Sequence, residues 1–174
     1  RYMAKLIEAV YGDALMETGK EKGILKQLLE EAEWLLEIFQ ANPELKLFLN
    51  HPRIATEEKV HVMEQVFGEA GQKEKKKSEL SREMLGFLKV IVEKKRQDIL
   101  DKILTYFADN VKEYFHIGVV FVAAPMELAA DQKKAVEKKI LKTTSYETLE
   151  VHYQIDPSLI GGLVIRIRDK VADN

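Results

Sequence analysis

The four histidines, His51, His61, His116 and His152, are the side chains best suited to proton transfer or metal binding near neutral pH. They lie far apart in the sequence, and none has a partner at the spacing typical of a metal site. The chain has no cysteine, which excludes disulfides, thiolate zinc sites and cysteine nucleophiles. We therefore predict that each histidine is a surface or boundary residue.

Three other patterns could carry chemistry, and in each the simpler structural interpretation is favoured. The carboxylates alternate with lysines at helical spacing, as on solvated helix faces rather than in acid–base pairs. Gly161 and Gly162 are followed by neither a lysine nor a helix, which makes them a weak phosphate-binding signal. The lysine-rich run 73–77 is interrupted by Glu74 and has no aromatic neighbour to stack on a base, so it indicates an exposed loop.

Composition places the chain among globular proteins with ample material for a core. Its 174 residues are 46% hydrophobic and 32% charged. With 27 basic and 29 acidic residues the formal net charge is −2, so the basic footprint of a nucleic-acid-binding protein is missing. The longest apolar run, 117–126, is about half of what a membrane span needs. The first ten residues carry charge throughout, unlike a signal peptide. We expect a soluble protein.

Apolar residues recur every three or four positions through the first two-thirds of the chain, which is the helical period. The spacing predicts a first helix that ends at Gly19 and Gly23. A third helix is predicted to begin at Pro43, with Asn42 as its cap. Pro52 separates it from a fourth. Six helices are predicted in all, and because their loops are short they favour an antiparallel bundle.

The period changes near residue 116. Residues 117–124 are a β-branched run, typical of a strand buried on both faces, and 131–141 form an amphipathic helix. Residues 149–155 alternate between apolar and polar, as a strand with one buried face does. Pro157 ends that strand, the glycine pair allows a bend or bulge, and 163–168 are predicted to form a hairpin strand.

The predicted fold class is mainly α: a six-helix antiparallel bundle over residues 1–115, followed by a small α/β domain over residues 116–174. The fifth helix, through residues 84–92, is apolar nearly all round. Trp34 lies outside the leucine stripe of the second helix and is interpreted as half-buried between helices rather than as part of a second interface. Surplus apolar helix surface without a catalytic constellation favours a protein that binds other proteins through helices.

Four segments resemble, in order and spacing, the delta subunit of F-type ATP synthases, the family that includes the mitochondrial oligomycin sensitivity conferral protein. They are EAVYGDALMETG (8–19), LKLFLNHPRIATEEK (45–59), FLKVIVEKKRQDILDKI (87–103) and IDPSLIGGLVIRIRDKVADN (155–174). The resemblance therefore covers nearly the whole chain, and it is most specific at the C-terminal signature, which includes Asp156, Pro157, Gly161 and Gly162.

The sequence departs from the family pattern at three places. Gly12 stands where the family usually has alanine, which is expected to weaken the first helix by about 1 kcal/mol. Arg168 replaces the usual glycine of a GDKV segment and would strain any turn that needs a positive φ. The chain stops at Asn174, where the family continues through a GSVRGRL-like segment into a last helix, so the resemblance implies a truncated C-terminal domain.

The resemblance implies a connector of the peripheral stalk that resists rotor torque, without catalysis or cofactor. In this family the six-helix domain binds the N-terminal helices of the alpha subunits of the catalytic head. The C-terminal domain holds the C-terminal end of the b-type stalk subunits. The resemblance implies no nucleic-acid partner, and a membrane association through the complex alone. It places the protein on the cytoplasmic side of the bacterial cell membrane, with the mitochondrial matrix or the chloroplast stroma as alternatives.

The family binds the alpha helix mainly in a groove between its first and fifth helices. Carried over to this sequence, the groove consists of Tyr11, Ala14, Leu15, Phe87, Val90 and Ile91. The small Ala14 would let a partner helix approach closely, and Tyr11 could bury its ring while its hydroxyl stays in water. The alternative is that these six residues only pack the two helices together.

Two other classes of function compete with the connector. A helical RNA-associated factor would show salt-dependent RNA binding, and the near-neutral charge counts against it. A small enzyme would need a convergent polar pocket, and no residues at recognisable spacing supply one.

Overall fold

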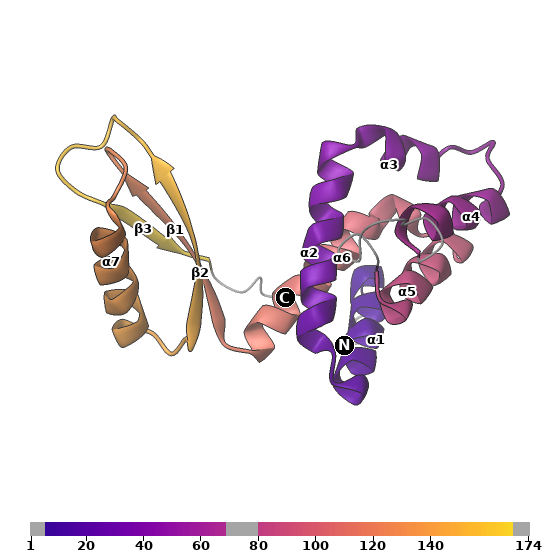
Figure 1. Ribbon diagram of the computed structural model, residues 1–174, viewed down its shortest axis with the longest axis horizontal. Coiled ribbons are helices and arrows are strands. Elements are labelled where there is room, and N and C mark those ends of the chain that lie inside the picture. The colour runs from indigo at the N-terminus through magenta and orange to yellow at the C-terminus, as the bar shows by residue number, and fades with distance from the viewer. Residues whose placement is uncertain (1–5, 69–79, 169–174) are drawn as a thin grey trace, which may run out of the picture. The chain divides into compact units, whose positions relative to one another are not determined.

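The computed structural model describes residues 6–68 and 80–168, so the lysine-rich run 73–77 lies outside the described residues. The chain divides into two compact units between Val111 and Lys112 (Figure 1). The helices that begin in the first unit are α1 (Ile7–Lys22), α2 (Leu25–Ala41), α3 (Pro43–Leu49), α4 (Thr56–Phe67), α5 (Arg82–Glu93), the short η3 (Gln97–Ile99) and α6 (Leu100–Tyr114). The mainly α class with a small α/β C-terminal part is confirmed. Within the described ranges, no helix is long and apolar enough to cross a membrane.

Helix α1 runs past Gly19 to Lys22, and Gly23 is its C-cap. Gly23 has a φ of 68°, in the left-handed region that favours glycine, and the N–H of Ile24 donates to the carbonyl of Gly19 at 3.0 Å. Gly19 itself is buried inside the helix. A Cβ there would lie 2.6 Å from Cδ1 of Leu25. The prediction that Gly19 helps to end the helix is therefore wrong, because the helix continues through it. The absence of a side chain at Gly19 instead lets Leu25 of α2 pack closely against α1.

Helix α3 begins at Pro43 with Asn42 at its N-cap position, as predicted, but the Asn42 side chain forms no capping hydrogen bond with α3. The Nδ2 of Asn42 donates to the carbonyl of Ile38 at 2.9 Å, which closes the end of α2 instead. Proline suits the first position of α3 because its missing N–H would have no partner there.

The core of the first unit is built mainly from α2, α4, α5 and α6. Ser81 begins α5: its hydroxyl accepts a hydrogen bond from the N–H of Met84 at 3.1 Å and donates to Glu31 of α2 at 2.7 Å. The side chains with no exposed surface are Leu28, Ala32, Leu35, Met63, Met84, Leu88, Ile91, Ile103, Leu104, Phe107 and Val111. They join four helices into one core.

The second unit contains a sheet of strand order β2–β1–β3. Its elements are β1 (Ile117–Ala124), α7 (Ala130–Thr143), β2 (Thr148–Ile155) and β3 (Val164–Ile167). β2 pairs parallel to β1, and β3 pairs antiparallel to β1 rather than to β2. The predicted hairpin is therefore wrong. β1 carries the most apolar sequence, and a central strand can bury apolar residues on both faces.

One face of the sheet packs against α7 (Figure 1). Val120 and Val122 of β1 are buried there with Ile140 of α7. Leu149, Val151 and Tyr153 of β2 pack against them, as predicted, but Ile155 at the end of the strand is 55% exposed. The strain expected at Arg168 does not occur, since its backbone is not among the described positions with positive φ. Its N–H donates to the carbonyl of Val119 at 2.8 Å and extends the pairing of β3 with β1.

Candidate functional site

All four histidines are exposed, which confirms the predicted surface or boundary positions. The Nδ1 of His51 accepts from the N–H of Arg53 at 3.1 Å, and the Nε2 of His152 lies 2.7 Å from the carboxylate of Glu150. Across residues 6–68 and 80–168, no group of three or more histidines and carboxylates could hold a metal ion. The features of these units that could form a functional site are exposed apolar surfaces suited to a protein partner.

Four of the six side chains proposed for the groove reach the surface of the first unit. Val90 of α5 is 42% exposed, Ala14 of α1 is exposed, and Tyr11 and Phe87 are half-buried. We call these four residues the α1–α5 surface. The other two, Leu15 and Ile91, lie in the core with exposures of 2% and 0%, so they can support this surface only from beneath.

An ion pair joins the end of α1 to the start of α5. The Nζ of Lys22 lies 3.5 Å from the Glu83 carboxylate. Ala14 lies two turns before Lys22 on α1, and Val90 lies two turns after Glu83 on α5. Ala14 on α1 and Val90 on α5 are therefore each about two helical turns from the ion pair.

Three more apolar side chains of α1 or its N-cap are exposed and were not assigned to the groove from sequence. Leu6, Ile7 and Val10 are 63%, 37% and 48% exposed. Ile7, Val10 and Ala14 follow one another at spacings of three and four, which places them on one face of the helix. The same spacing was visible in the sequence, but sequence alone did not distinguish the exposed part of this face from the part that packs inward.

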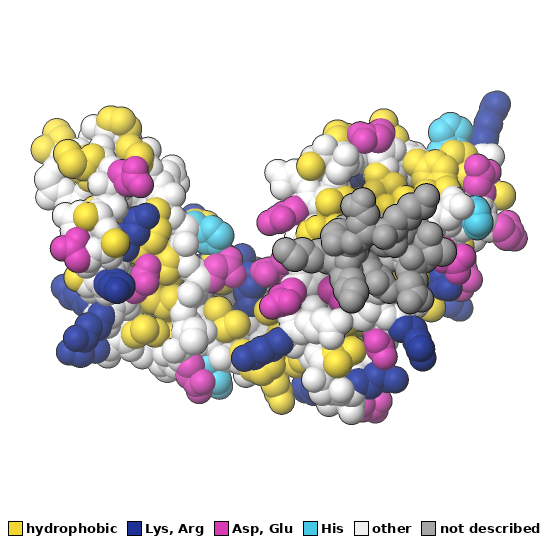
Figure 2. Space-filling model, viewed as in Figure 1, with side chains coloured by type: hydrophobic (Ala, Val, Ile, Leu, Met, Phe, Trp, Pro, Cys, Tyr) yellow, Lys and Arg dark blue, Asp and Glu magenta, His cyan; other side chains and the backbone are white. Residues whose placement is uncertain are grey.

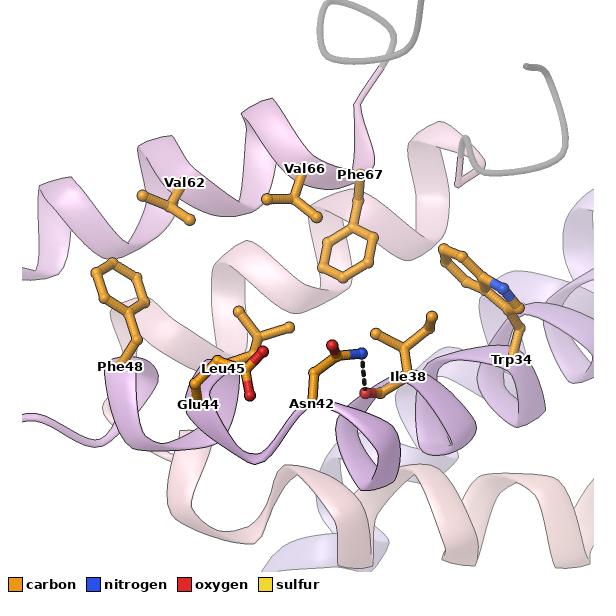
Figure 3. A pocket seen from close by; sticks show the side chains of 9 residues that line it. All are labelled: Trp34, Ile38, Asn42, Glu44, Leu45, Phe48, Val62, Val66 and Phe67. Atoms are coloured by element: carbon orange, nitrogen blue, oxygen red, sulfur yellow. Dashed lines mark hydrogen bonds between the residues drawn. The ribbon is translucent and has the colours of Figure 1, made fainter. Parts of the chain in front are cut away.

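A second apolar surface, which we call the α2–α4 pocket, lies between α2, α3 and α4. Hydrophobic side chains gather on the molecular surface over α3 and α4 (Figure 2). The pocket has a volume of about 500 Å³. It is lined by Trp34, Ile38, Asn42, Glu44, Leu45, Phe48, Val62, Val66 and Phe67 (Figure 3).

Trp34 forms one end of the α2–α4 pocket. It is half-buried, as predicted, and its ring meets that of Phe67 edge to face, with 5.7 Å between the ring centroids. The sequence did not predict that Trp34 lines a pocket, because the other wall comes from α4, a separate helix.

The C-terminal signature forms a turn after β2. The N–H of Asp156 donates to the carbonyl of Ala124 at 2.7 Å. The carboxylate of Asp156 accepts from the hydroxyl and the N–H of Ser158, which lowers its pKa. Pro157 and Gly162 are exposed, and Gly161 has a φ of 71°, in the left-handed region. The hydrogen bonds of Asp156 and the left-handed conformation of Gly161 set the path of the chain from β2 to β3. This structural role accounts for the signature residues without a ligand.

A charged cluster lies within the second unit. The Nζ of Lys112 lies 2.6 Å from Glu150, whose other carboxylate oxygen contacts His152. Partial burial alone would raise the pKa of Glu150, but the hydrogen bonds and positive charges of Lys112 and His152 outweigh it, so the pKa is lowered. The Lys112 side chain is 9% exposed, and this carboxylate compensates its buried charge.

Comparison with known proteins adds independent findings. Residues 7–174 match the family model described as "ATP synthase delta (OSCP) subunit". The chain is 38% identical over 172 residues to the ATP synthase subunit delta of Lachnoclostridium phytofermentans, covering 99% of this chain and 90% of that protein. It is 31% identical over 163 residues to the ATP synthase subunit delta of Prochlorococcus marinus (strain MIT 9301), covering 94% of this chain and 86% of the relative.

The fold is also similar to a solved structure. A chain in the cryo-EM structure of the Toxoplasma gondii mitochondrial ATP synthase hexamer matches with a TM-score of 0.65 at 21% identity. The match covers 92% of this chain and 85% of that chain. At this identity the similarity supports the fold.

Proposed function

The chain belongs to the ATP synthase delta (OSCP) subunit family, and from this premise we propose which surfaces hold its partners. It is a peripheral-stalk, or stator, subunit of the ATP synthase and performs no catalysis of its own. Its partners are other subunits of that complex. Such a subunit works by holding its partners in place, so its functional residues are those that bury surface against them.

The N-terminal helices of the alpha subunits bind the α1–α5 surface in this proposal. The observation that carries it is the set of apolar side chains left exposed on both helices, from Val10 and Ala14 on α1 to Val90 on α5. An amphipathic helix laid across them would cover its own apolar face and theirs, and would bury roughly 800 Å² per side in an interface of standard size. Leu15 and Ile91 would hold the surface rigid from the core.

The second unit holds the b-type stalk subunits in the same proposal. Val164 and Ile165 of the edge strand β3 are 51% and 44% exposed, and Ile160 in the loop before β3 is 96% exposed. Exposed aliphatic side chains at a sheet edge are suited to a protein partner. The complex would place this chain on the cytoplasmic side of a bacterial membrane, which the bacterial relatives support.

The test of the alpha-subunit assignment is a calorimetric titration of the full chain with a peptide of the alpha N-terminus. A peptide of about twenty residues spans about 30 Å as a helix. We expect one-to-one binding with a negative heat-capacity change, the mark of apolar burial. Val90→Glu should weaken binding at least about tenfold, because it places a charge in the apolar contact.

Val66→Glu is the matched control, since Val66 is 41% exposed on α4 and lies outside the α1–α5 surface. It should bind the alpha peptide as the parent does. Circular dichroism would establish that both variants are folded. Unchanged affinity in folded Val90→Glu would refute the α1–α5 assignment.

A further inference from the structure

We propose that the α2–α4 pocket is a second docking site, for an amphipathic helix whose apolar stripe is flanked by lysine or arginine. The proposal rests on the proposed function in one respect, because the helix would belong to another subunit of the ATP synthase. It concerns a different face of the first unit from the α1–α5 surface, and it is carried by different residues.

The walls of the pocket have the spacing of a helix-binding site. Trp34 and Ile38 are one turn apart on α2, and Val62 and Val66 are one turn apart on α4. Leu45 lies between these walls, on α3 (Figure 3). Apolar pairs on two helices, with a hollow between them, can receive side chains that project from one face of a partner helix at intervals of three and four residues.

Polar groups in the pocket are too few for a small-molecule site, which needs several converging donors and acceptors. Asn42 and Glu44 are the polar residues that line it. The Nδ2 of Asn42 is already used, because it donates to the carbonyl of Ile38. The pocket therefore offers an occupant mainly apolar contacts, together with one carboxylate, that of Glu44. This favours the apolar side chains along one face of a protein helix.

The charged side chain that lines the pocket is acidic, and this selects the kind of helix. Glu44 lines the pocket, Glu37 precedes Ile38, and Glu58 lies one turn before Val62 on α4. Within residues 6–68 and 80–168, these three carboxylates form no ion pair. A partner with lysine or arginine beside its apolar stripe would supply the missing cations, whereas an acidic helix would be repelled.

Two synthetic peptides test the proposal against the full chain. Both would be helices of about twenty residues with the same leucine stripe; one would carry lysine beside the stripe and the other glutamate. Trp34 is the only tryptophan of the chain, so its emission reports directly on the pocket. We expect the lysine peptide to shift that emission to shorter wavelength and to bind at least about tenfold more tightly than the glutamate peptide.

Three variants determine where and why the peptide binds. Val66→Glu should weaken the lysine peptide at least about tenfold, and the double variant Glu37→Lys, Glu44→Lys should reverse the preference between the peptides. Val90→Glu, matched to Val66→Glu in residue type and exposure, should leave the lysine peptide bound. Equal binding of the two peptides, an unchanged Trp34 emission, or no effect of Val66→Glu would each overturn the proposal.

The crossed design separates this proposal from the previous one. If the alpha peptide fails to bind but the lysine peptide responds to Val66→Glu, the α1–α5 assignment fails and the second site stands. If the alpha peptide responds to Val90→Glu and the lysine peptide does not bind, the second site fails and the α1–α5 assignment stands.

Discussion

The aromatic ring of Tyr106 lies directly over Gly12, so that a Cβ built on Gly12 would be 2.5 Å from Cδ1 of the ring. The hydroxyl of the same tyrosine donates to Asp13 at 2.8 Å. Tyr106 thus holds α1 against α6 by packing on one residue and bonding to the next. This explains why glycine stands where the family usually has alanine: the missing methyl group is the space that the ring occupies.

Gly12→Ala is expected to destabilise the first unit, although alanine favours helix more than glycine does. The propensity gain is about 1 kcal/mol, and the overpacking cost is about 1–3 kcal/mol. The ring cannot move away freely, because the Asp13 bond holds its far end. We expect a net loss of about 1 kcal/mol, measured by denaturant unfolding followed through Trp34 fluorescence.

A companion substitution at Tyr106 identifies the cause. In the Tyr106→Leu background the clash is gone, so Gly12→Ala should become neutral or stabilising there. Tyr106→Phe keeps the ring, loses the Asp13 bond, and should cost about 0.5–1.5 kcal/mol. If Gly12→Ala stabilises the parent, the ring yields easily and the packing argument is wrong.

Ser81→Ala should destabilise the start of α5. The substitution removes the hydroxyl that accepts from Met84 and donates to Glu31, while the N–H of Ser81 still donates to Glu31 at 3.0 Å. Loss of a serine N-cap costs about 0.5–2 kcal/mol. Amide exchange in the first turn of α5 should accelerate, and Ser81→Thr, which keeps a hydroxyl that can both accept and donate, should restore part of the protection.

Stability of the second unit should fall at acid pH through Glu150. Its pKa in the folded protein lies below the ordinary value of 4.5, so the carboxylate stabilises the fold above that value. The contribution is lost as the pH falls through the lowered pKa. Glu150→Gln should therefore be less stable than the parent at neutral pH, and the difference should shrink below about pH 4.5.

Calorimetric unfolding of the parent and of Glu150→Gln between pH 7 and pH 3 would measure this effect. Glu127→Gln, an exposed carboxylate of the same unit, is the control for loss of one negative charge. A stability difference that stays constant over the whole range would mean that Glu150 does not titrate with folding.

Phe121 joins the three strands on the sheet face opposite α7. Its ring stacks on His152 of β2 at 5.0 Å, and the guanidinium carbon of Arg166 of β3 lies 4.4 Å from its centroid. Phe121→Leu should cost about 1–2 kcal/mol, because it removes an aromatic and a cation–π contact together. Phe121→Tyr should retain both. Hydrogen exchange in β2 and β3 would report the loss, and equal protection in Phe121→Leu would contradict it.

The sequence predicted the elements well where local chemistry decides them. The helical period, Pro43 at the start of α3 and the β-branched run of β1 appear in the structure as predicted. Each depends on residues close together in the chain: a period of three to four, a fixed φ, or a preference for a pleated surface. The same local strings carried the resemblance that the family model confirms.

Other features depended on partners distant in the chain. From sequence, Gly19 was predicted to end a helix, but in the structure it is the place where Leu25 packs against α1. The segment of β3 was predicted to pair with β2 in a hairpin, but it pairs with β1. Among the six groove residues, sequence alone could not separate Val90, which is exposed, from Ile91, which is buried.

The sequence by itself therefore determined the helices, the strands, the fold class and the family. Only the tertiary structure decided the strand order, which apolar side chains remain at the surface, and that Trp34 of α2 and Val66 of α4 line one pocket. The physical reason is that period and propensity act between near neighbours, whereas burial and pockets arise from contacts between helices that lie far apart along the chain.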